Sequence, residues 1–247
     1  MKKMSSKRNQ LLLEKWDFIL ILGESGGGKG TLVSNIKKYW MEDLNAASMG
    51  DIFRRKAQTD PEIRELTNQG ILVGDDLALE IFAEFARANH PGLIDGFPRN
   101  RGQVIQLIKF IKENDWRVLV IDLHCRVEKI IERLLARQRA DDNLSIVYKR
   151  HTDHMHLHPL VMAEIRTRPD LFDIITLDGN LDAEIVFSNL LLDVLRLVDM
   201  LYFYDMTDIE THFLAHDDES TINPALNRWI CGFLKSIQKK LDAKYNS

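Results

Sequence analysis

The sequence predicts an α/β fold in which a doubly wound, five-stranded parallel sheet carries helices on both faces and is followed by a helical C-terminal extension. Two observations support this prediction. Five short apolar runs alternate with segments whose apolar residues recur at helical spacing. A glycine-rich loop follows the first run and precedes the first helical segment, where parallel sheets commonly carry a phosphate-binding loop.

The predicted strands are short and consist mainly of apolar or small residues. They are residues 17–22, 46–49, 92–95, 116–124 and 172–177. Apolar residues at helical spacing predict helices between and after them. These are residues 31–40, a helix carrying Arg54 and Arg55, residues 61–68, 75–88, 103–112 and 128–137, a helix containing Arg150, and residues 181–200. Strands that alternate with helices in this way favour parallel pairing in one sheet.

Composition narrows the classes of partner. The chain has 247 residues, of which 45% are hydrophobic, and a net charge of −4. This length suits one large domain, or a domain of roughly 200 residues with an appendage. A negative net charge does not attract nucleic acid to the chain as a whole. Any binding of anions must therefore depend on a local cluster of positively charged residues. No apolar run reaches the ~18 residues of a membrane span, and Cys125 and Cys231 are too few for a disulfide framework. We therefore expect a cytoplasmic protein without a membrane segment.

Residues 23–31 read Gly-Glu-Ser-Gly-Gly-Gly-Lys-Gly-Thr. Glycines allow such a loop to turn sharply and to bring backbone N–H groups close to phosphate oxygens, and the following helix N-terminus adds a favourable dipole. Gly23, Gly28 and Lys29 match the pattern G-x-x-x-x-G-K, but the usual hydroxyl is displaced by one residue to Thr31. Strand, loop and helix together predict a P-loop NTPase-type site rather than a flexible linker.

The glycine loop and the turn Asp95-Gly-Phe-Pro-Arg99 together resemble the adenylate kinase family of nucleoside monophosphate kinases. The resemblance extends from about Phe18 to Phe187. It implies a phosphotransferase that moves the terminal phosphoryl group of MgATP to a nucleoside monophosphate, with ATP and the monophosphate as partners. Such a reaction brings two polyanions together and so requires several cations, for which arginine is well suited.

The resemblance implies a role for each residue that matches a family motif. Residues expected to bind ATP are Gly23, Gly26, Gly27, Gly28, Lys29, Gly30, Thr31, Arg133, Arg137 and Gly179. Residues expected to bind the monophosphate are Met49, Arg54, Val73, Gly96, Arg99, Gln103, Arg139 and Arg150. Those expected to take part in catalysis are Lys29, Arg99, Arg133, Arg139 and Arg150. Asp95 is expected to orient Mg²⁺ through water, with Thr31 as a second candidate.

The identity of the acceptor base is a weaker implication. Gln103 stands where adenylate kinases are expected to read adenine, which favours AMP and the reaction ATP + AMP = 2 ADP. UMP or CMP is the alternative, because Met49 replaces the family's Thr and because Asn100 after Arg99 is typical of the pyrimidine-specific branch.

The resemblance also implies a domain organisation. Residues 16–200 would form the kinase domain, with a monophosphate-binding segment at 46–89 and a short lid at 137–150. The lid has no room for a four-cysteine zinc site, so no zinc is expected. Residues 201–247 lie outside the resemblance and predict a helix with one apolar stripe. The stripe either packs on the helix at 181–200 in a monomer, which we expect, or forms a dimer.

Two other interpretations stay open. The short lid, Met49 and the extension also suit a nucleotide-binding sensor or scaffold without turnover, and a P-loop kinase with another small acceptor is a further alternative. Separately, four histidines cluster near Asp153, namely His151, His154, His156 and His158. Of these, His154 and His158 have the i, i+4 spacing of a helical metal pair. With no third ligand at a matching position, we expect an exposed helix face there. Glu24 and Ser25 depart from the family loop, which has Pro in place of Ser25.

Overall fold

The computed structural model describes residues 15–137 and 144–197. Its centre is a parallel sheet of five strands in the order β2-β3-β1-β4-β5. The strands are β1 (Phe18–Gly23), β2 (Asn45–Ser48), β3 (Gly92–Asp95), β4 (Val118–His124) and β5 (Phe172–Asp178). All five predicted strands are therefore confirmed. From β1 the chain crosses to the edge strand β2, returns to β3 beside β1, and then adds β4 and β5 on the other side of β1, which is a doubly wound arrangement.

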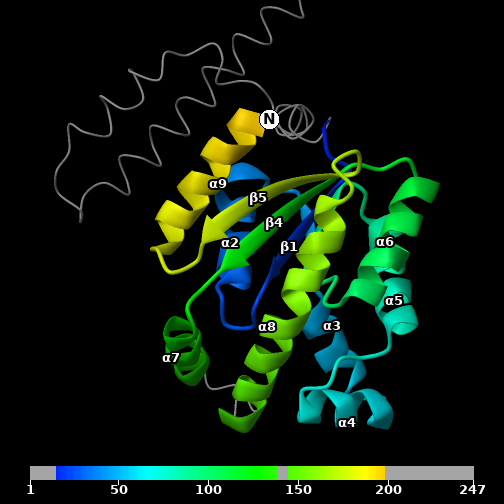
Figure 1. Ribbon diagram of the computed structural model, residues 1–247, viewed down its shortest axis with the longest axis vertical. Coiled ribbons are helices and arrows are strands. Elements are labelled where there is room, and N and C mark those ends of the chain that lie inside the picture. Colours follow the sequence, from blue (N-terminus) through cyan, green and yellow to red (C-terminus); the bar gives the residue numbers. More distant parts are fainter. Residues whose placement is uncertain (1–14, 138–143, 198–247) are drawn as a thin grey trace, which may run out of the picture.

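Helices cover both faces of the sheet (Figure 1). They are α2 (Lys29–Asn35), the π-helical turn η1 (Ile36–Trp40), α3 (Met49–Lys56), α4 (Pro61–Gln69), α5 (Asp75–Ala88), α6 (Arg101–Glu113), α7 (Val127–Arg137), α8 (Leu144–Arg166) and α9 (Ala183–Leu197). The predicted helix at 31–40 thus begins two residues earlier and ends in a π-helical turn. The helix that contains Arg150 is 23 residues long and includes Pro159.

Alternate residues of β1 enter two separate hydrophobic cores. Phe18 and Leu20 belong to the core beneath α5, α6 and α8, whereas Ile19 and Ile21 belong to the core beneath α2 and α9. This alternation follows from the period of two along a strand. Because both faces are covered, all residues of β1 from Phe18 to Leu22 are buried, as expected of a central parallel strand.

Short polar side chains fix where several helices start. Asp60 accepts hydrogen bonds from the backbone N–H groups of Glu62 and Ile63 before α4. Asn100 accepts one from the N–H group of Gln103 before α6. These caps satisfy donors that lack a partner within the helix. The cap at Asn100 places α6 directly after the turn that ends at Arg99.

Some expectations concern residues outside the described part of the chain. They include Arg139, residues 138–143 of the predicted lid, and the C-terminal extension at 201–247. Among the described residues, none of the helices has both the length and the apolar character needed to span a membrane.

Candidate functional site

The glycine loop connects β1 to α2 at the carboxyl edge of the sheet. Gly23 has a φ of 133°, and a Cβ there would lie 2.4 Å from the carbonyl oxygen of Leu123. Gly28, the residue before α2, has a φ of 103°. Because side chains rarely adopt such backbone angles and no space exists at Gly23, glycine is required at both ends of the loop. The loop delivers the chain into the N-terminus of α2, which favours anions.

Lys29 is the buried cation of this loop. Its Nζ donates hydrogen bonds of 2.9 Å to the carbonyl oxygens of Gly23 and Glu24. Burial lowers the pKa of Lys29 to about 8; Asp95 counteracts this shift, whereas the positive charges of Arg99 and Arg137 add to it. An anion bound beside Lys29 would offset the cost of burying its positive charge. The loop therefore favours binding of an anion.

Two clefts meet at the glycine loop. The first, which we call the α3–α8 cleft, is lined by residues of α3 and α8 together with Val73, Gly96 and Gln103. The second, the α2–α7 cleft, is lined by the glycine loop, α2, Asp95, Gly179 and two arginines of α7. Residues shared by both linings are Ser25, Lys29, Gly50, Arg54 and Arg99. The molecule therefore offers two adjoining spaces with cations where they meet.

Arg99 lies at this junction, immediately after the Gly96-Phe-Pro turn. Its Nε donates a hydrogen bond of 2.8 Å to the carbonyl oxygen of Gly96, whose φ of 78° turns the chain. Burial lowers the pKa of Arg99; Asp95 opposes the shift, and the charges of Arg150 and Arg54 add to it. Like charges held close together in a partly dehydrated site disfavour one another, and an anion between them relieves the repulsion.

Arg133 and Arg137 reach the α2–α7 cleft from α7. The Nη1 of Arg133 donates to the carbonyl oxygen of Gly27 at 3.3 Å. Beneath it, the apolar face of α7 packs on the loop so closely that a Cβ at Gly26 would lie 2.8 Å from Cγ of Leu134. The packing of α7 against the loop therefore positions Arg133 beside it.

Gln103 lines the α3–α8 cleft and is 2% exposed. Its Oε1 accepts a 2.7 Å hydrogen bond from the backbone N–H of Arg99, and its Nε2 donates to Asp75 at 3.1 Å. Asp75 also accepts a 2.7 Å hydrogen bond from Asn100. The side-chain amide is thus held in a fixed orientation, while one N–H and one lone pair of its full capacity remain.

Comparisons with known proteins agree with these features of the site. The profile of the family described as adenylate kinase matches residues 21–168, which is more than half of the chain. An adenylate kinase of Prochlorococcus marinus is 32% identical over 178 residues, covering 69% of this chain and 94% of that protein. The chain belongs to the adenylate kinase family. It is accordingly a nucleoside monophosphate kinase.

Two further similarities define the limits of this result. A protein named UMP-CMP kinase 1 from Oryza sativa subsp. japonica is 32% identical over 145 residues, covering 56% of this chain and 58% of that protein. A solved structure described as a sugar kinase from a Janibacter species has a TM-score of 0.51 at 21% identity, covering 72% of this chain and 95% of that one. The latter similarity concerns the fold alone.

Within this adenylate kinase family member, the structure brings nearly all of the predicted site residues to the two clefts. Those expected to bind ATP line the α2–α7 cleft, except that Gly23 lines the α3–α8 cleft beside them. Those expected to bind the monophosphate line the α3–α8 cleft, except Arg139, which lies outside the described residues. Their individual roles stay predictions.

The expectation of an exposed histidine face on α8 is wrong for three of the four histidines. His151 contacts Glu24, His154 lies in the α3–α8 cleft, and His158 hydrogen bonds to Asp122, whereas His156 is exposed. Burial lowers the pKa of His154 to about 3, and the neighbouring imidazole of His158 contributes to this shift. The three contact-forming histidines have helical spacing and share one face of α8. The same stripe continues into buried Val161, Met162 and Ile165, a signal that could have revealed it.

The sequence interpretation also missed two carboxylates beside the site. Asp75 orients Gln103 and Asn100 from the start of α5. Glu24 in the glycine loop is buried and contacts α8 through His151. Each carboxylate lies far in the sequence from the residues that it contacts, so no local sequence pattern predicts these contacts.

Proposed function

We propose that this nucleoside monophosphate kinase moves the terminal phosphoryl group of MgATP to AMP and yields two molecules of ADP. The observation that carries the proposal is the pair of clefts that adjoin at Lys29 and Arg99. Direct transfer needs two nucleotides whose phosphates face each other across one cationic point. A single nucleotide would need only one of the two clefts.

We assign ATP to the α2–α7 cleft. The loop glycines allow backbone N–H groups to approach phosphate oxygens, and Gly30 leaves open space because no described atom lies within 4 Å of a Cβ built there. Lys29 would release its two loop carbonyls and bind donor phosphates, while Arg133 and Arg137 neutralise the triphosphate charge from α7. Gly179 contributes through its lack of a side chain, which lets the chain pass close to the glycine loop. A Cβ there would lie 3.0 Å from the carbonyl oxygen of Gly27.

We assign the acceptor to the α3–α8 cleft. Arg54, Arg99 and Arg150 line this cleft and would hold the acceptor phosphate. Arg99 also lines the other cleft, so its guanidinium can stabilise charge on the transferring group as well. Arg139 is proposed to join Arg150 when the lid covers the site, in a domain organised as the resemblance implies. Exclusion of water by that closure would favour transfer to AMP over hydrolysis.

The donor set at the junction fits Mg²⁺. Asp95 ends β3 and Thr31 belongs to α2, and both line the α2–α7 cleft. A carboxylate and a hydroxyl are the hard oxygen groups that Mg²⁺ accepts, directly or through water. When bound with ATP, the ion would neutralise phosphate charge and orient the phosphates. The chain's own contribution is to hold Asp95 at a fixed strand end beside Lys29.

AMP is the proposed acceptor because of Gln103. Held by Arg99 and Asp75, its amide keeps one donor and one acceptor, the combination that an adenine edge requires. Asn100, which favoured a pyrimidine acceptor, is engaged in capping α6 and in binding Asp75. UMP or CMP remains the alternative, in keeping with the similarity to a protein named UMP-CMP kinase 1.

The proposal is tested with a panel of acceptors. The full-length protein is incubated with MgATP and AMP, UMP, CMP, GMP or dTMP, and diphosphate formation is measured. We expect the highest kcat/KM with AMP. A clear preference for UMP or CMP would replace the acceptor, and binding of nucleotides without any diphosphate product would support a sensor or scaffold instead.

Other expectations accompany this proposal. We propose that the protein acts as a monomer in the cytoplasm and needs no nucleic acid, with residues 201–247 as an appendage to the kinase domain. Size-exclusion chromatography with light scattering tests the monomer, because a dimer would double the measured mass.

A further inference from the structure

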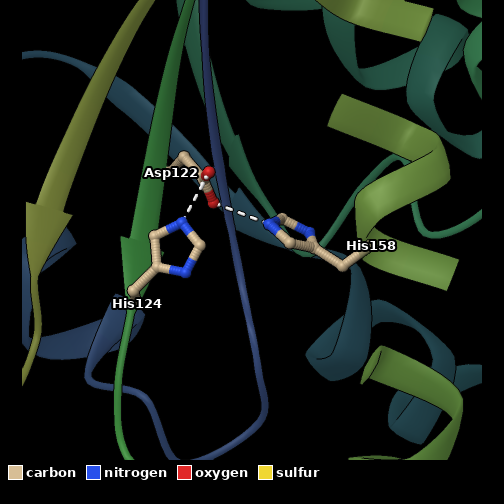
Figure 2. Close-up of side chains that lie close together, drawn as sticks. All are labelled: Asp122, His124 and His158. Carbon is tan, nitrogen blue, oxygen red and sulfur yellow. Dashed lines mark hydrogen bonds and ion pairs between the residues drawn. The ribbon is translucent and has the colours of Figure 1, made fainter. Parts of the chain in front are cut away.

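A cluster of three side chains that the proposed reaction does not use lies between β4 and α8. Asp122 on β4 has a side chain that is 1% exposed. The Nε2 of His124 lies 2.8 Å from its Oδ2, and the Nε2 of His158 lies 2.8 Å from its Oδ1. Figure 2 shows both imidazole rings turned toward the carboxylate, one from the strand and one from the helix. Two nitrogen ligands and one oxygen ligand therefore converge.

We propose that Asp122, His124 and His158 bind one divalent transition-metal ion of the zinc class. Their potential ligand atoms all lie within 4.8 Å of one another. Zinc binds imidazole nitrogen at about 2.0–2.1 Å and carboxylate oxygen at about 2.0–2.2 Å, so ligand atoms around it stand roughly 3–3.5 Å apart. The two nitrogens already lie within hydrogen-bond distance of the carboxylate. Only a small adjustment of the rings is needed.

The exposure of the three side chains favours an open site. His124 is 54% exposed and ends β4, whereas His158 is 11% exposed. An ion can therefore enter from the side of His124. Water can occupy the fourth coordination position, which the three protein ligands do not fill. The exposed ring can also rotate toward the ion at little cost. His158 is less mobile, because the ring of His154 stacks on it with centroids 4.5 Å apart.

The ligand types separate this site from the magnesium that accompanies ATP. Two imidazoles and one carboxylate suit Zn²⁺, Co²⁺ or Ni²⁺, whereas Mg²⁺ prefers oxygen ligands and retains much of its water. The site is also distinct from the zinc lid considered for the family, since its ligands come from β4 and α8. The sequence expectation of no zinc depended on the short lid and on the lack of a third ligand beside His154 and His158. The fold brings Asp122 to His158, and Asp122 in turn contacts His124.

A metal at this position would link the sheet to the helix that carries Arg150. The ion would bond to Asp122 and His124 on β4 and to His158 on α8. In the sequence, His158 is 36 residues from Asp122 and 34 residues from His124. Because His158 also lines the α3–α8 cleft, the ion would lie beside the wall of that cleft. We therefore expect metal binding to stabilise the folded protein against heat.

The test uses the untagged full-length protein after treatment with a chelator. Titration calorimetry with Zn²⁺, and with Mg²⁺ as a comparison, gives affinity and stoichiometry, and Co²⁺ gives an absorption spectrum that reports coordination. The His124→Gln variant removes an exposed ligand but keeps a group that can donate to Asp122. The matched control is His156→Ala, which alters an exposed histidine of α8.

We expect wild-type protein and His156→Ala to bind one Zn²⁺ with an increase in melting temperature, and to ignore Mg²⁺ at this site. His124→Gln should lose at least about tenfold in Zn²⁺ affinity. Bound Co²⁺ should show a tetrahedral or five-coordinate spectrum without thiolate bands. Absence of Zn²⁺ binding by the wild type, equal binding by His124→Gln, or a thiolate spectrum would each overturn the proposal.

Discussion

Glu24 in the glycine loop and His151 on α8 form a contact in which the Nδ1 of the imidazole lies 3.0 Å from both carboxylate oxygens. Glu24 is 8% exposed, so its charge has little water to stabilise it. The contact joins the phosphate-binding loop to the residue that follows Arg150. It thereby holds the loop against α8, whose Arg150 lines the α3–α8 cleft.

Removal of His151 should therefore destabilise the protein. In His151→Ala, Glu24 loses its partner while remaining buried, and we expect the free energy of unfolding to fall by about 1–3 kcal/mol. Urea denaturation measures this change, with His156→Ala as a control on the same helix. The double variant Glu24→Gln/His151→Ala should recover part of the loss. Equal stability of His151→Ala and His156→Ala would show that the contact has no energetic importance.

The depressed pKa of Lys29 predicts proton uptake when ATP binds. The free protein has a Lys29 pKa of about 8, so above that pH the amine is largely neutral. Phosphate charge favours the protonated form and raises the pKa again. At about pH 9, calorimetry in buffers of different ionisation enthalpy should show uptake of nearly one proton per ATP. Lys29→Arg should show none, and zero uptake by the wild type would contradict the assigned environment.

The glycines of the loop should respond in opposite ways to alanine. Gly23→Ala places a Cβ against the carbonyl oxygen of Leu123 at a φ of 133°, so we expect severe destabilisation or failure to fold. Gly30→Ala meets no described atom within 4 Å and lies in α2, so the melting temperature should rise, with a gain of about 0.5–1 kcal/mol. If phosphate occupies the space beside Gly30, ATP affinity should fall in the same variant. Unchanged ATP affinity would argue against that position for the phosphates.

The two clefts predict different kinetic effects for two arginines. Each of the two arginines lines only one of the two clefts. Arg137 lines the α2–α7 cleft, and Arg150 lines the α3–α8 cleft. Arg137→Met should raise the KM for ATP, and Arg150→Met the KM for AMP, each by roughly 10- to 100-fold, as expected when a charged hydrogen bond is lost. Steady-state kinetics with each substrate varied in turn measures this. The same change in both KM values for both variants would contradict the assignment of clefts.

The sequence predicted the features that depend on local patterns. Apolar runs identified all five strands, and the glycine loop placed Lys29 at the start of α2. These predictions succeed because strand burial and glycine backbone angles are encoded by neighbouring residues. The arginines required the family resemblance, since an arginine on a helix is usually a surface charge.

The contacts of α8 were not predictable in the same way. Glu24 and His151 are 127 residues apart, and Asp122 and His158 are 36 apart. Whether a helical histidine is exposed or reaches a carboxylate depends on how the helix packs on the sheet. The spacing of the α8 histidines was visible, but the strand residue that completes each contact was not.

Direct transfer between two bound nucleotides is the central claim, and it is tested by following the γ-phosphoryl group itself. The protein is incubated with ATP labelled in the γ-phosphate and with unlabelled AMP, and the products are separated. We predict that the label appears in ADP formed from AMP, with one labelled and one unlabelled ADP for each AMP consumed, and that Lys29→Ala abolishes the transfer. Binding of both nucleotides without label in ADP, or release of the label only as inorganic phosphate, would contradict the account.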